Sequence, residues 1–175
     1  MSCSLLKSLV AVGCLAAWTG SAWAETKVTL SKTHVCCPQC EKVIAKVLED
    51  AGAKGAASKA DGSVTFTAAD DAAAQKTVDA LAAAGFHGTT DNKDIKVKDN
   101  SGVKEGKVAS LTLKGVHNCC GQCNTAIKNT LKKIEGVESD DAKAKSDTLT
   151  VKGNFDGQAL VKALNDVGFH VTAEK

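Results

Sequence analysis

Six of the eight cysteines in this 175-residue chain lie in two short clusters of the same form. The clusters span 34–40 and 117–123, and both read H-x-C-C-x-Q-C at an offset of 83 positions. Thiolates and imidazoles at this density are the ligands that select soft ions such as Cu(I) and Zn(II). The candidate metal-binding residues are Cys36, Cys37, Cys40, His34, Cys119, Cys120, Cys123 and His117.

Each candidate also has a simpler interpretation. In an oxidising compartment, Cys-x-x-Cys pairs form disulfides. Cys36 and Cys119 are alternatively small buried residues, and His34 and His117 alternatively cap their loops. A bond between adjacent cysteines is disfavoured, because neighbouring Cα atoms lie about 3.8 Å apart and disulfides usually need at least about 4.4 Å. Two further histidines, each after a Gly-Phe pair, are expected at the surface; they are His87 and His170.

The first 24 residues are predicted to be a signal peptide. An apolar run from Leu9 to Trp18 precedes Ala22-Trp23-Ala24, the small-x-small pattern of a signal-peptidase site. The run is shorter than the roughly 20 residues of a membrane span, which disfavours a membrane anchor, and lipidation of Cys14 is a further alternative. We therefore expect an exported protein, periplasmic or extracellular, whose mature chain has no membrane span.

The remainder of the chain is a tandem repeat. The offset of 83 also carries Val28-Thr29-Leu30 onto Leu111-Thr112-Leu113, and Gly85-Phe86-His87 onto Gly168-Phe169-His170. Hydrophobic spacing in each copy predicts a strand, the cysteine loop, a helix, two strands, a helix and a final Phe-His strand. This order is a split βαβ unit, so the predicted fold class is α+β with two tandem ferredoxin-like domains at 26–90 and 108–175. The polar segment 91–107 reads as a solvated linker.

Each repeat resembles the heavy-metal-associated (HMA) domain of metallochaperones and of the N-terminal tails of metal-pumping ATPases. The resemblance rests on Cys37-Pro38-Gln39-Cys40 with Ile44, and on Cys120-Gly121-Gln122-Cys123 with Ile127. It implies that the Cys-x-x-Cys loop binds a soft metal ion for transfer to a partner, such as a metal-transporting ATPase or another metal-binding protein.

The repeats depart from this family at the site. Where the family has Gly-Met-x-Cys, these loops have His34-Val35-Cys36-Cys37 and His117-Asn118-Cys119-Cys120. The extra thiol and His favour tighter binding and storage over rapid shuttling, and they leave Cu(I) and Zn(II) as equal candidates ahead of Hg(II) and Cd(II). The sole methionine is Met1, so a thioether copper site is disfavoured. Asn118 is expected to pack less well than Val35.

Composition narrows the remaining classes of function. All 22 basic residues are Lys and the formal net charge is +2, so the chain lacks the basic stripe of a nucleic-acid binder. It shows no Ser-His-Asp set or phosphate loop, and we expect no enzymatic activity. The main alternative is an exported thiol-disulfide redox protein that uses the same Cys-x-x-Cys pairs. The only proline, Pro38, lies inside the first motif, whereas thioredoxin-like enzymes need a second proline facing the cysteines.

Overall fold

The computed structural model describes residues 24–174, so the predicted signal peptide and Cys14 lie outside the described residues except for Ala24. The first domain comprises β1 (Thr26–Ser31), α1 (Pro38–Asp50), β2 (Lys54–Ser58), β3 (Ser63–Ala68), α2 (Asp71–Ala83) and β4 (Thr89–Thr90). The second comprises β5 (Lys107–Lys114), α3 (Gly121–Leu131), β6 (Val137–Asp140), β7 (Thr148–Asp156), α4 (Gly157–Asp166) and β8 (Thr172–Ala173). Within the described residues, no helix is long and apolar enough to cross a bilayer.

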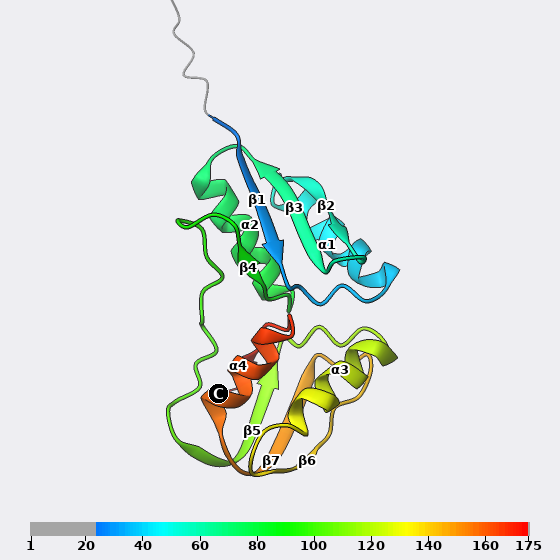
Figure 1. The fold of residues 1–175 in the computed structure, drawn as a ribbon, viewed down its shortest axis with the longest axis vertical. Coiled ribbons are helices and arrows are strands. Elements are labelled where there is room, and N and C mark those ends of the chain that lie inside the picture. The colour runs from blue at the N-terminus through cyan, green and yellow to red at the C-terminus, as the bar shows by residue number, and fades with distance from the viewer. Residues whose placement is uncertain (1–23, 175) are drawn as a thin grey trace, which may run out of the picture.

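Both domains have the same sheet topology. The strand orders are β2-β3-β1-β4 and β6-β7-β5-β8, and every neighbouring pair is antiparallel. With one helix after the first strand and another after the third, each domain is a βαββαβ unit (Figure 1). The predicted α+β class with two ferredoxin-like domains is confirmed.

The helices follow from local sequence signals. Pro38 occupies the first turn of α1, where its missing N–H has no intrahelical partner to lose. Cys40, Ile44 and Leu48 recur every four residues and form the buried face of α1. In α2, the side chain of Asp70 accepts a hydrogen bond from the Ala73 N–H at 2.7 Å and so caps the helix.

The prediction of a final Phe-His strand is wrong. The Phe-His segments do not form the last strands, because β4 and β8 begin two residues beyond His87 and His170. Their backbones instead pair with each other across the domain boundary.

This boundary is organised around a bridge between the two Gly-Phe-His segments. Phe86 pairs with Phe169 in an antiparallel bridge. The His87 N–H donates to the Gly168 carbonyl at 3.0 Å, and the His170 N–H donates to the Gly85 carbonyl at 2.9 Å. The two segments, which lie 83 positions apart, are therefore related by a pseudo-two-fold axis, as the two subunits of a symmetric dimer are.

Glycine at this bridge permits the close approach of the domains. A Cβ added at Gly85 would lie 2.6 Å from the backbone nitrogen of His117, and one at Gly168 would lie 2.2 Å from that of His34. Both glycines also have positive φ, +87° and +91°, a region that side chains disfavour. The loops preceding α1 and α3 consequently face each other across the boundary (Figure 1).

The connecting segment is exposed over most of its length but is held at two points. Ile95 is 1% exposed and belongs to the hydrophobic core. Gln75 on α2 exchanges two hydrogen bonds with the backbone of Lys96, and the Ser101 carbonyl accepts one from the Ala173 N–H. The segment is therefore packed along both domains, in addition to being solvated.

Candidate metal centre

The two cysteine loops are placed by the strand and helix on either side of them. In each domain the chain leaves β1 or β5 and enters a helix whose N-cap is the second cysteine of the motif, Cys37 or Cys120. Neither N-cap uses its side chain to cap the helix, so both thiols remain available for other partners. The last cysteine of each motif, Cys40 or Cys123, lies on the buried face of its helix.

Thiols from the two loops gather into one cluster. Within the loops, four sulfur pairs lie 3.6–3.7 Å apart: Cys36 with Cys40, Cys37 with Cys40, Cys119 with Cys123, and Cys120 with Cys123. Across the boundary, four more lie 3.3–3.7 Å apart: Cys36 with Cys120, Cys36 with Cys123, Cys37 with Cys119, and Cys40 with Cys119. Sulfurs of different domains are thus as close as sulfurs of one loop.

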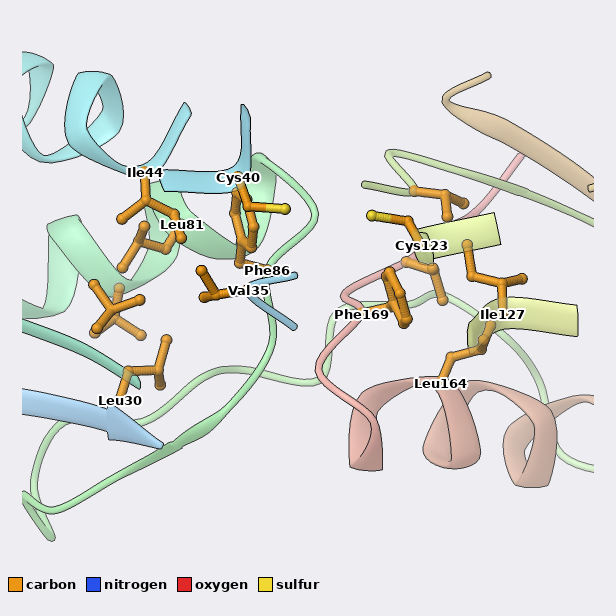
Figure 2. Packing of buried hydrophobic residues seen from close by; sticks show 14 of the residues in the cluster. Leu30, Val35, Cys40, Ile44, Leu81, Phe86, Cys123, Ile127, Leu164 and Phe169 are labelled. Atoms are coloured by element: carbon orange, nitrogen blue, oxygen red, sulfur yellow. The ribbon is translucent and has the colours of Figure 1, made fainter. Parts of the chain in front are cut away.

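These contacts follow the same pseudo-two-fold relation as the bridge. Shifting both partners by 83 positions converts the Cys36–Cys120 contact into Cys119–Cys37, and Cys36–Cys123 into Cys119–Cys40. Figure 2 shows Cys40 and Cys123 pointing toward one another from their separate helices. All six cysteines of the two loops are free thiols.

Both predicted histidines lie at the cluster and contact the opposite domain. The Nε2 atom of His117 is 3.3 Å from the Cys40 sulfur. The Nε2 atom of His34 is buried without a hydrogen-bond partner, and a ring nitrogen of His34 lies within 4.8 Å of the sulfurs of Cys36 and Cys123. A buried ring nitrogen without a partner is costly, and a bound cation would satisfy it.

Phenylalanines hold these imidazoles in place. The His34 ring stacks on Phe169 with centroids 4.3 Å apart, and the His117 ring packs on Phe86 at 4.1 Å. Burial lowers the pKa of His34. The nearby Cys40 raises this pKa, and His117 lowers it further. A lowered pKa keeps the ring neutral, and the neutral ring is the form that ligates metals.

Thiol acidity differs sharply within the cluster. Hydrogen bonding from Cys123, together with His117 and backbone N–H groups, lowers the pKa of Cys40 to about 2. The same hydrogen bond raises the pKa of Cys123. Burial raises the pKa of Cys36 to about 12. Without a cation, the cluster therefore keeps thiolate charge on few sulfurs, because closely spaced negative charges repel in a partly buried site.

Four groups of side chains are close enough to share an ion. Each has its ligand atoms within 4.8 Å of one another: Cys40, His117, Cys119 and Cys123; His34, Cys36 and Cys123; Cys36, Cys37 and Cys40; Cys37, Cys119 and Cys120. The first is a Cys₃His set, a common composition for tetrahedral Zn(II) sites. It draws ligands from both domains, and all eight predicted residues occur in at least one group.

The residue before each cysteine pair fills a buried position in both loops. Val35 is 6% exposed and Asn118 is 5% exposed. The Asn118 amide donates to the Asn124 side chain at 3.1 Å and to the Lys143 carbonyl at 3.0 Å. The second loop is therefore as buried as the first, and hydrogen bonds replace apolar packing there.

The other two histidines lie at the boundary, apart from the four ligand groups. Their rings are nearly parallel, with centroids 5.7 Å apart. His170 is 4% exposed, so the expected surface position is wrong for it, whereas His87 is half-buried. The Nε2 atom of His170 lies 2.7 Å from the Asn100 side-chain oxygen.

Comparison with known families identifies the second repeat. Residues 111–170 match the heavy-metal-associated domain. This stretch is an HMA domain. It contains the second loop with all of its thiols, the imidazole of His117 and the Gly-Phe-His segment. The first domain repeats the topology of this HMA domain, strand for strand and helix for helix.

Two further comparisons add context. The solution structure of the N-terminal soluble domains of Bacillus subtilis CopA is similar to this chain at 18% sequence identity, covering 87% of this chain and 95% of that chain, with a TM-score of 0.32. No curated protein matches the sequence.

Sequence reasoning missed the residues that join the HMA domain to its neighbour. Phe86 and Phe169 are core residues, and they also pair across the boundary and pack against the imidazoles. The signal was the Gly-Phe-His triplet repeated at the offset of the cysteine loops. A duplicated surface that contains glycine and an aromatic residue is suited to close backbone approach.

Proposed function

We propose that this protein binds soft metal ions through its cysteine loops after export, and that it stores or carries them without catalysing a reaction. The observation that carries the proposal is the Cys₃His group of Cys40, His117, Cys119 and Cys123, with all ligand atoms within 4.8 Å. Such a set of deprotonated thiols and a neutral imidazole supplies the ligand type and number of a closed four-coordinate site. The HMA match of residues 111–170 supports the same function.

Access to the cluster supports exchange with a partner. An open depression of about 580 Å³ on one side of the boundary is lined by Cys36, Lys59 and Gln122, among others. On the other side, a depression of about 360 Å³ reaches Cys119 beside Lys145. A thiolate from a donor or acceptor protein can approach a half-buried thiol here, so a metal-transporting ATPase or another metal-binding protein is a suitable partner.

Cu(I) and Zn(II) are the ions that this ligand set favours. Thiolate ligands select both, and imidazole suits Zn(II) in particular. The described residues contain no methionine to supply a thioether ligand. Hg(II) and Cd(II) bind thiolates too, and they rank behind because the set includes histidine.

Anaerobic titration of the reduced protein tests the proposal. We expect Zn(II) and Cu(I) to bind with release of thiol protons, measured by native mass spectrometry and competition with a chromophoric chelator. The double variant Cys37→Ser with Cys120→Ser should bind more weakly, whereas Lys46→Ala, at an exposed salt bridge on α1, should not change binding. A reduced protein that takes up neither ion would refute metal binding.

Export has a separate test. The proposal requires cleavage after Ala24, so the mass of the protein recovered outside the cytoplasm should correspond to a chain that begins at Glu25. Retention of the first 24 residues on a membrane-bound form would favour the anchor or lipidation instead.

A thiol-disulfide redox protein is the second candidate. Its support is the close spacing of free thiols, since the sulfurs of Cys37 and Cys40 are 3.6 Å apart and need only a short movement to bond. Reduction of a disulfide substrate by the metal-free dithiol would leave this pair oxidised and the substrate as two thiols. Catalytic turnover in that assay, lost in Cys37→Ser with Cys120→Ser, would favour this alternative over metal storage.

A further inference from the structure

We infer that the two loops form one shared, polynuclear metal-thiolate site across the domain boundary, in place of two independent sites with one ion per domain. This inference rests on the proposed metal binding and specifies its architecture. Its ligand class is a soft cation such as Cu(I) or Zn(II), held by sulfurs that belong to both domains.

The sulfur geometry does not divide by domain. The four contacts across the boundary measure 3.3–3.7 Å and the four within the loops 3.6–3.7 Å. A tetrahedral ion with metal-sulfur bonds of about 2.3 Å holds its sulfurs about 3.8 Å apart. Ions can therefore enter triangles that mix the loops, such as Cys36 with Cys120 and Cys123, with only small movements.

Some cysteine sulfurs can bridge two metal ions, because they belong to more than one ligand group. Cys40 belongs both to the Cys₃His group and to the group with Cys36 and Cys37, and Cys123 belongs to two groups in the same way. A thiolate that contacts two neighbouring ion positions can bond to both. The cluster can thereby hold more ions than its two Cys-x-x-Cys pairs would hold separately.

The histidines complete the shared arrangement. His117 reaches Cys40 of the other domain at 3.3 Å, and a ring nitrogen of His34 lies within 4.8 Å of the Cys123 sulfur, also of the other domain. Each imidazole thus lies close to a cysteine of the opposite loop. The Phe86–Phe169 bridge fixes this crossover, because those two rings carry the imidazoles.

Paired variants in the full chain distinguish a shared site from separate sites. Cys36→Ser with Cys37→Ser leaves the second loop intact, and Cys119→Ser with Cys120→Ser leaves the first intact. These four cysteines are half-buried, and the variants retain the core residues Cys40 and Cys123. Anaerobic Cu(I) titration against a competing chelator measures stoichiometry and affinity for each protein.

A shared site predicts that the unmodified protein binds more than two Cu(I) per chain, and that each variant loses affinity for every equivalent by at least tenfold. Two Cu(I) per chain, with one unchanged equivalent remaining in each variant, would overturn the shared site while leaving the proposed function intact. No binding by the unmodified reduced protein would overturn the proposed function itself. Circular dichroism of the metal-free variants controls for loss of folding.

A second variant tests the boundary without changing a thiol. His87→Asp with His170→Asp places two carboxylates where the rings now lie 5.7 Å apart, and their repulsion separates the domains. We expect Cu(I) stoichiometry to fall to two, with weaker binding. His87→Gln with His170→Gln, which adds no charge, is the matched control and should retain the higher stoichiometry. Unchanged stoichiometry in the Asp variant, despite domain separation shown by small-angle scattering, would refute sharing.

Discussion

The two domains have kept different residues for different reasons. Positions that face the boundary are the same in both, namely the cysteines, the histidines and the Gly-Phe-His segments. Positions that support the loops from behind have diverged, as Val35 and Asn118 show. Identical residues therefore occur at the surface where the repeats meet, and also at core positions such as Leu30 with Leu113 and Ile44 with Ile127.

The largest expected effect concerns the aromatic bridge. Phe86→Ala and Phe169→Ala each remove a side chain that is 0% exposed, and such core truncations cost about 3–5 kcal/mol of unfolding free energy. Because the two residues are related by the pseudo-two-fold axis, we expect similar losses from urea unfolding of the reduced protein. A large loss in one variant alone would show that one domain dominates stability.

Exchanging the supporting residues sharpens the comparison. Val35→Asn buries an amide where the first loop has apolar packing, and an unpaired buried group costs about 1–3 kcal/mol. Asn118→Val removes the donor to the Lys143 carbonyl and should destabilise by a similar or smaller amount. Thermal unfolding of each variant measures the difference. Equal tolerance of both exchanges would mean that the loops do not depend on these supports.

Acid should weaken the boundary before it unfolds the domains. Burial and the neighbouring His170 lower the pKa of His87 to about 4, against raising influences from Asp166 and Asp99. A lowered histidine pKa contributes stability that is fully present above about pH 6.5 and is lost as the pH falls toward 4. Small-angle scattering of the metal-free protein should show domain separation in this range. Burial also lowers the pKa of His170, so His87→Gln with His170→Gln should remove most of that pH dependence.

The smallest expected effect concerns a salt bridge that only the second domain has. Lys128 pairs with Asp140 at 2.6 Å in a partly exposed salt bridge, whereas the first domain has Ala45 and Ala57 at these positions. Lys128→Ala should therefore cost less than about 1 kcal/mol in urea unfolding. A larger cost would show that the second domain relies on a contact its counterpart lacks.

Local patterns predicted the fold of each domain well, because strands, helices and turns depend on nearby residues. The start of α1 at Pro38 and the buried Ile44 and Leu48 follow directly from such patterns. The predicted Phe-His strands were wrong because an aromatic residue after a glycine indicates burial but does not identify the partner. A strand and an interdomain bridge present the same short sequence.

The candidate site was predictable as a set of residues and unpredictable as an arrangement. Spacing placed three thiols and one imidazole in each loop, and those eight side chains do gather in the structure. Which thiol lies beside which depends on docking between segments far apart in sequence, such as Cys36 and Cys123, which are 87 residues apart. No periodicity within one repeat encodes that pairing.

The packed connecting segment makes the meeting of the two loops independent of protein concentration. Two separate molecules carrying one loop each would meet less often as their concentration fell. Here residues 91–106 tether the loops, and short linkers impose an effective local concentration on the order of millimolar. The encounter of the loops is therefore unimolecular and insensitive to how much protein is present. A scarce protein would assemble its cluster as readily as an abundant one.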